Sequence, residues 1–357
     1  MRDNLDRQTD RQTDRQTDRQ TELYNCTFVK TILMLVVVFY HSILFWRGGW
    51  FTMDPAETSV VLGYLAGWLN SFHIYAFTLV SGYIFYHLKY EKGRYARFLP
   101  FVVNKAKRLL IPYAFASVFW VIPIHSLFFG FDVGNVLWNY LLAVNPSQLW
   151  FLIMLFLVFV ICWCLSDFFK KYDWLSFGVV LVAYSIGLVG SAVAPNIFRI
   201  WTALCYVPFF WIGFKLRQHG CVWIRKIPSW MWIVASILTH TLAQYLEHFE
   251  AIIFKLMTRG FLFASCVIGA LMAFFVLQKL ASLFRGDSRG FAFLSRRSMA
   301  VYLFHQQIVY GGIYLLNGVV CLYLNATVNF VAATVISLLI ATILLRFRIT
   351  RFLIGEK

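Results

Sequence analysis

Lys30 and His41 stand in an apolar stretch, KTILMLVVVFYHS at residues 30–42, that otherwise has the composition of a membrane-spanning helix. The eleven steps from Lys30 to His41 cover about 16 Å of helix axis and return to within about 20° of the same face. That face is expected to point into a helix bundle, because ionisable groups within a membrane seldom face lipid. A neutral imidazole there could act as a general base, since its unperturbed pKa of about 6.5 is close to working pH. The alternative is a histidine that only hydrogen-bonds a neighbouring helix.

The apolar segments hold almost no carboxylate that could accompany His41. Asp54, Glu57, Glu247 and Glu250 lie in or beside loops. A Ser-His-Asp triad requires a carboxylate to orient its imidazole, so a serine-hydrolase site is disfavoured. A base that acts directly on a substrate hydroxyl fits these residues better.

A second candidate stretch is NKAKRLLIPY, residues 104–113, which places Lys105 and Arg108 one helical turn apart. Two cations at this spacing could bind the phosphates of a donor such as a CoA thioester. The alternative is ordinary anchoring of a membrane helix by basic residues on its cytoplasmic side.

Two further segments place polar or small residues inside the membrane. His305 lies about halfway along an apolar segment that begins SRRSMAVYLFHQQI at residue 295, where a polar contact between helices is the simpler interpretation. Ser81 and Gly82 lie in LVSGYIFY, residues 79–86, where small residues usually permit close helix packing. A substrate-lining role for Ser81 is the alternative.

The chain that must position these residues is 357 residues long, 60% hydrophobic and only 13% charged. We predict an all-α membrane protein, a polytopic bundle of about ten transmembrane helices, because each apolar segment is near the ~20 residues that cross a bilayer. The segments are approximately 27–46, 67–88, 109–128, 148–167, 174–193, 199–216, 229–246, 258–278, 298–317 and 326–345. The net charge of +16 is spread over the loops between them, which disfavours nucleic-acid binding. The seven cysteines show no ligand spacing, so no metal is expected.

The basic residues concentrate in alternate loops, which predicts that both termini are cytoplasmic. The other loops hold only Arg47, Arg199, Lys255 and Arg259. Residues 1–25 are predicted to form a disordered tail that contains four DRQT repeats at 6–21, because the repeat has almost no apolar side chain. Residues 26–357 form the predicted membrane domain.

Six stretches, in order along the chain, together resemble the acyltransferase-3 family of integral membrane acyltransferases, which O-acetylate cell-surface glycans. Lys30 and His41, with ten residues between them, resemble the family's first-helix signature. LVSGY (79–83) resembles the second-helix motif, and KAKRLLIPY (105–113) is similar to the Arg-x-x-Arg stretch before the third helix, with Lys105 replacing the first Arg. Later motifs are LWFLIMLF (149–156), YVPFFWIGF (206–214) and SMAVYLFHQ (298–306). The resemblance covers about residues 27–350.

This resemblance implies a multi-pass enzyme of the bacterial inner membrane. It would transfer an acyl group, most often acetyl from acetyl-CoA, to a hydroxyl of lipopolysaccharide or another envelope glycan. His41 is then expected to be the catalytic base. The expected donor- or substrate-binding residues are Lys30, Lys105, Arg108, Ser81, Trp150 and His305. The expected partners are an acyl-CoA donor substrate, a glycan or glycolipid acceptor and the bilayer, with no bound cofactor and no nucleic acid.

A transporter of glycan or lipid intermediates is the main alternative, because helices with polar interiors also suit that function. Transporters tend to have Gly- or Pro-interrupted helices in related halves, and the sequence shows no such symmetry. A non-catalytic scaffold has no positive support. The repeat adds a genetic hypothesis: a DNA tract of repeated GACA translates to Asp-Arg-Gln-Thr, and in such a tract gain or loss of one four-base unit would shift the reading frame and switch the enzyme off. Mixed synonymous codons or a misassigned start site are the alternatives.

Overall fold

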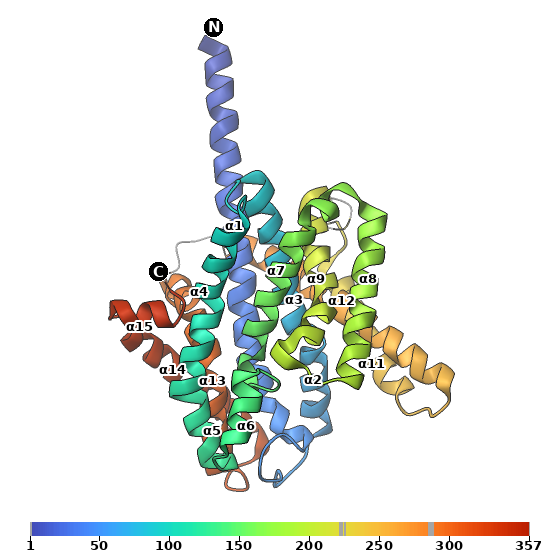
Figure 1. Cartoon of the computed structure of the whole chain (residues 1–357), viewed down its shortest axis with the longest axis vertical. Coiled ribbons are helices and arrows are strands. Elements are labelled where there is room, and N and C mark those ends of the chain that lie inside the picture. The colour runs from blue at the N-terminus through green and yellow to red at the C-terminus, as the bar shows by residue number, and fades with distance from the viewer. Residues whose placement is uncertain (1, 221–223, 225, 285–288, 357) are drawn as a thin grey trace.

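The computed structural model describes residues 2–220, 224, 226–284 and 289–356, with the backbone alone for residues 2–22. These residues form a helical bundle with no β-strand (Figure 1). The long helices are α1 (Arg2–Leu44), α3 (His73–Tyr86), α4 (Phe98–Ala116), α7 (Trp150–Lys171), α8 (Asp173–Val193), α9 (Ile200–His219), α11 (Ser229–Leu246), α12 (Ile252–Leu283), α13 (Arg289–Leu316) and α14 (Leu322–Leu344). The shorter ones are α2 (Val60–Asn70), α5 (Ile122–Phe129), α6 (Val133–Val136) and α15 (Arg348–Leu353).

Eight helical segments of the described residues are long and apolar enough to cross a membrane, which confirms a multi-pass membrane protein. They are Leu23–Arg47, Val60–Glu91, Phe98–Phe129, Ser147–Lys171, Asp173–Val193, Ile197–His219, Ile252–Leu283 and Leu322–Leu344. The other two predicted spans correspond to α11 and α13, which are helices but are less apolar. Helix α13 carries the buried His305, Gln306 and Gln307. The count of ten spans and the cytoplasmic termini stay predictions.

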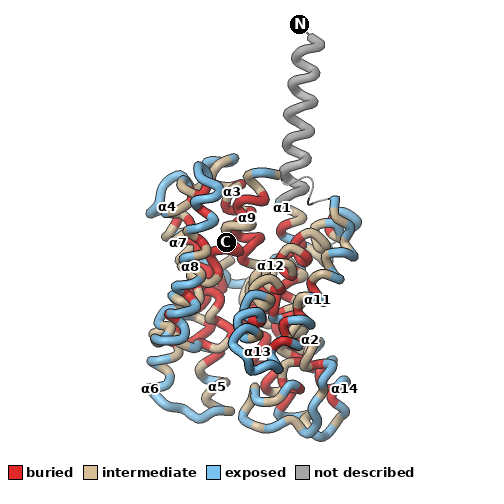
Figure 2. Tube along the Cα trace, turned by 90° about the vertical axis from the view of Figure 1, so that its right-hand side faces the viewer, coloured by how far each residue is buried: buried red, intermediate tan, exposed pale blue. Residues whose placement is uncertain are grey.

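Helix α1 lies in the middle of the bundle and packs against α2, α3, α12, α13 and α14 (Figure 1). Met34, Val37 and Val38, on the face predicted to point inward, are buried. Buried residues lie between the helices and exposed residues on their outer faces (Figure 2). The exposed residues include large apolar side chains such as Val189 on α8 and Leu339 on α14, as expected where helices meet lipid.

Helices α3 and α9 approach each other most closely at two glycines. A Cβ atom added to Gly82 would lie 2.0 Å from the carbonyl oxygen of Phe210, and one added to Gly213 would lie 1.9 Å from that of Leu79. Only glycine allows backbones to meet at this distance. The glycine of the LVSGY stretch therefore serves close helix packing.

The DRQT repeat lies within the backbone of α1, which the structure assigns as helix from Arg2. The sequence predicted a disordered tail over residues 1–25. An isolated helix with few apolar residues is marginal in water, and only tertiary packing would change that. The division of the chain into a tail and a membrane domain at residue 25 stays a prediction.

Candidate active site

A cavity of about 460 Å³ lies among α1, α3, α5, α7 and α13, and it falls within the ~300–1,000 Å³ that small-molecule sites occupy. His41 of α1 and Trp150 of α7 both line it. Phe, Trp and Tyr form the largest group in the lining, which also holds three histidines, four side-chain amides and one arginine. Among the described residues no Asp or Glu lines this cavity.

His41 and His305 meet at the cavity wall, although 264 residues separate them in the chain. Nε2 of His305 lies 3.2 Å from Nδ1 of His41, and the ring centroids are 5.0 Å apart. His305 is fully buried in α13, whereas His41 is partly exposed to the cavity. The structure thus joins two histidines that the sequence placed on different helices without assigning them to each other.

Backbone carbonyls fix which nitrogen of each ring carries the proton. Nδ1 of His305 lies 2.8 Å from the carbonyl oxygen of Tyr302 and 3.1 Å from that of Val301. A carbonyl oxygen only accepts, so this Nδ1 donates and Nε2 of the neutral ring keeps its lone pair. Nδ1 of His41 faces that lone pair and, at 2.9 Å, the carbonyl oxygen of Val37. Both of these neighbours accept, so Nδ1 of His41 carries the proton.

It follows that Nε2 of His41 holds the free lone pair, as a general base requires. Within the described residues this nitrogen makes no hydrogen bond, and the ring lines the cavity. When Nε2 accepts a proton, the imidazolium that forms still donates through Nδ1 to His305. His305 therefore occupies the place that a carboxylate has in a serine-hydrolase triad, but it is neutral.

Hydrogen bonds of glutamine side chains connect the segment at the start of α7 to α13. Nε2 of Gln148 donates to Oε1 of Gln307 at 2.7 Å and to the carbonyl oxygen of Leu303 at 3.0 Å. The Tyr302 hydroxyl donates to the carbonyl oxygen of Gln148. These bonds hold the segment that leads into Trp150, the first residue of α7, against the helix that carries His305.

The predicted donor-binding cations gather at the other end of the bundle. Lys105 lies within electrostatic range of both Lys30 and Arg108. Its Nζ sits 3.7 Å from the ring centroid of Phe159, in a cation–π contact. Among the described residues none of these three cations forms an ion pair with a carboxylate within 4.0 Å. Helix rise puts Lys30 of this cluster about 16 Å from His41 along α1.

The C-terminal segment after α15 packs on α4 beside this cluster. A Cβ atom added to Gly355, whose φ is +80°, would lie 3.0 Å from the carbonyl oxygen of Arg108. Burial raises the pKa of the neighbouring Glu356 carboxyl, and the charges of Arg108 and Arg296 oppose that shift. One acidic group thus lies near the cluster without pairing with it.

Of the other predicted site residues, Trp150 lines the cavity and Ser81 does not. The hydroxyl of Ser81 donates to the carbonyl oxygen of Phe77 at 2.8 Å, within its own helix. Sequence reasoning did not select Arg199, which lines the cavity together with Asn145. One indication of it was present in the sequence: Arg199 is among the few basic residues in the loops that are otherwise poor in Lys and Arg.

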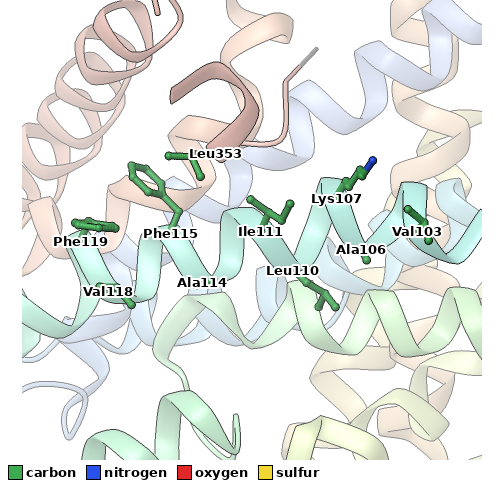
Figure 3. Close-up of a pocket in the computed structure, with 10 residues that line it drawn as sticks. All are labelled: Val103, Ala106, Lys107, Leu110, Ile111, Ala114, Phe115, Val118, Phe119 and Leu353. Atoms are coloured by element: carbon green, nitrogen blue, oxygen red, sulfur yellow. The ribbon is translucent and has the colours of Figure 1, made fainter. Parts of the chain in front are cut away.

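A second hollow, of about 510 Å³, lies along α4 and is lined by apolar side chains except for Lys107 (Figure 3). Leu353 of α15 closes part of it. Val118 and Phe119 are largely exposed there, as expected of a surface that faces lipid. It offers no convergent polar groups, so we place the chemistry at the cavity of His41.

The chain is thus a multi-pass membrane protein in which a pair of histidines lies beside a cavity and a basic cluster lies apart from it. A family model described as an acyltransferase domain matches residues 23–346, and the chain belongs to this acyltransferase-3 family of integral membrane proteins. The family resemblance of the sequence is confirmed, and the chain is an acyltransferase rather than a transporter. Comparisons with curated proteins and with solved structures gave no match.

Proposed function

We propose that this enzyme is an O-acyltransferase that moves acetyl from acetyl-CoA to a hydroxyl of a cell-envelope glycan, such as lipopolysaccharide, with His41 as the general base. The observation that supports it best is the fixed tautomer of His41, whose free Nε2 lines an aromatic cavity. Aromatic faces with a few polar groups suit a sugar ring. The absence of a carboxylate from the cavity lining, among the described residues, favours direct action of the base on the hydroxyl.

In the proposed reaction, Nε2 of His41 takes the proton of the acceptor hydroxyl as its oxygen attacks the thioester carbonyl. The carbon–sulfur bond then breaks, and the CoA thiolate leaves with the proton from the imidazolium. An ester and free CoA are the products. Through both steps Nδ1–H of His41 points to His305 and Val37, which keep the ring in place.

The basic cluster of Lys30, Lys105 and Arg108 would bind the phosphates of CoA at the cytoplasmic side. The proposal includes a topology of ten spans with both termini in the cytoplasm, and it places the enzyme in the bacterial inner membrane. The donor's thioester arm then has to reach about 16 Å into the bundle to meet His41. The acceptor would enter the cavity from the opposite side.

Mass spectrometry of envelope glycans tests the proposal directly. Cells that express the chain should carry acetyl groups that cells without the gene lack. His41→Ala should lower their level to a small fraction while the protein still accumulates in the membrane, because a general base contributes about 10²–10⁴-fold to rate. Normal glycan acetylation in cells with a stably inserted His41→Ala protein would refute the assignment.

A further inference from the structure

Arg199 is the one Lys or Arg that lines the cavity of His41, among the residues that the structure describes. Its Nη2 donates to Oδ1 of Asn145 at 3.2 Å, and its guanidinium carbon lies 5.6 Å from the ring centroid of Trp150. Its Nε is buried and has no hydrogen-bond partner in the described part of the chain. No described carboxylate lies within ion-pair distance of it.

The backbone holds Arg199 in this place against its own preference. Phe198 and Arg199 have φ values of +50° and +59°, in the left-handed region that residues other than glycine seldom adopt. The amide of Phe198 donates to the carbonyl oxygen of Leu142 at 2.8 Å, and the amide of Trp201 donates to Oδ1 of Asn196 at 3.0 Å. Strain of this kind tends to occur where a side chain must be aimed at a ligand.

The remaining described positive-φ residues other than glycine lie in the segment that hydrogen-bonds to Phe198 and Arg199 through Leu142 and Asn145. They are Ala143 and Ser147, with φ values of +53° and +50°, and they flank Asn145. All four such residues that the structure describes therefore lie in the two segments that position Arg199, Asn145 and the start of α7. The strain is concentrated at this one site.

A partly buried guanidinium without a carboxylate lacks the partner that normally offsets its desolvation. Its planar set of N–H donors matches the two oxygens of a carboxylate or a phosphate. The three histidines of the cavity supply no negative charge: backbone carbonyls of Val37 and Leu69 hold His41 and His73, and His125 stacks on Phe129. The described lining therefore offers no anion to Arg199, and a bound substrate is the remaining source of one.

We propose that the acceptor carries an anionic group, a carboxylate or a phosphate, and that Arg199 binds it while the sugar ring lies against Trp150. This inference rests on the proposed function, because it takes the cavity as the acceptor site. Arg199 and His41 line one cavity of about 460 Å³, so the anion and the acylated hydroxyl belong to the same sugar or to adjacent sugars.

Binding without donor tests the anion site apart from the chemistry. The purified protein in lipid nanodiscs is titrated with matched pairs of sugars: galacturonate and galactose for the carboxylate, mannose 6-phosphate and mannose for the phosphate. One anionic member should bind at least about tenfold more tightly than its neutral partner, and Arg199→Gln should remove about 10–100-fold of that affinity, the effect of losing a charge-assisted bond. Arg199→Lys should restore part of it, because it keeps the charge but not the planar donors.

Arg259→Gln is the matched control, since Arg259 is exposed on α12 and does not line the cavity. It should leave all four affinities unchanged. Equal binding of both members of each pair, binding of none, or an Arg199→Gln protein that binds as wild type does, would overturn the inference.

Acyl transfer from labelled acetyl-CoA, in vesicles that contain the cell's own glycans, then reports on the proposed function separately. If anion binding depends on Arg199 but no acetyl transfer is seen, the anion site is supported and the acyltransfer proposal is refuted. If acetyl transfer occurs and Arg199→Gln leaves its rate unchanged, the acyltransfer proposal is supported and the inference of an anionic acceptor is refuted.

Discussion

Removal of His305 should slow acyl transfer without abolishing it. In the structure His41 donates from Nδ1 to two acceptors, the Val37 carbonyl oxygen at 2.9 Å and Nε2 of His305 at 3.2 Å. His305→Ala deletes one acceptor and leaves the other, so the His41 ring keeps its tautomer but loses one of the two hydrogen bonds that orient it. His305→Gln offers an amide oxygen in place of Nε2 and should preserve part of the effect.

The magnitude follows from the charge that develops on His41. When His41 takes a proton, its bond to His305 becomes a hydrogen bond from a charged donor, which contributes about 1.5–3 kcal/mol. At about 1.4 kcal/mol per tenfold, His305→Ala should lower the rate about 10–150-fold. His41→Ala should cost more, about 10²–10⁴-fold, because it removes the base itself.

The assay is the rate at which label from acetyl-CoA enters glycan in membrane vesicles, normalised to the amount of folded protein. The decisive measurement is the double variant: His305→Ala should have no further effect once His41 is Ala, because His305 acts only through His41. Independent, multiplicative losses in the double variant would show that His305 has another role. An unchanged rate in His305→Ala, with normal accumulation, would refute the pairing.

Three further predictions address the donor, the fold and the repeat. Replacement of Lys105 and Arg108 by Gln should raise the acetyl-CoA concentration for half-maximal transfer about tenfold or more, since bonds to charged groups contribute about 1.5–3 kcal/mol; an unchanged titration in vesicles would leave only an anchoring role. Gly213→Ala places a Cβ 1.9 Å from a carbonyl oxygen of α3 and should reduce the yield of monodisperse protein, whereas Gly178→Ala, whose Cβ meets nothing within 4 Å, should not. Deletion of residues 6–21 should leave transfer intact, and sequencing of the gene's 5′ end from many colonies should show repeat numbers that vary with glycan acylation; a mixed-codon tract or a constant number would contradict the switch.

The sequence predicted the helices of the membrane domain well, because a bilayer demands segments of nearly fixed length and composition. It also predicted the inward face of α1, since Lys30 and His41 share that face. It missed that α11 and α13 are less apolar than the other spans. The polar residues of α13, such as His305 and Gln307, face the bundle interior, so this helix does not need a fully apolar sequence.

The partner of His41 could not be predicted. Helical periodicity tells which face of α1 points inward, but not which of the other helices meets it. The sequence also did not predict that Arg199 lines the cavity, because it shows Arg199 only as a cation in a loop poor in basic residues. Two consecutive left-handed residues carry it to the cavity, and non-glycine residues in this conformation leave little trace in a sequence.

A pair of histidines suits a base that has to work inside a membrane. A carboxylate partner would place a formal charge among apolar helices throughout the catalytic cycle, at a cost of about 2.5–3.5 kcal/mol on insertion scales. The neutral His305 accepts from His41 without that charge, and its own Nδ1 proton is held by backbone carbonyls of α13. In the proposed reaction, charge appears at His41 only while the acceptor proton is in transfer. The orientation that a triad obtains from a third, ionised side chain comes here from the main chain of two helices, so the proposed base needs no carboxylate, and no described Asp or Glu lines the cavity.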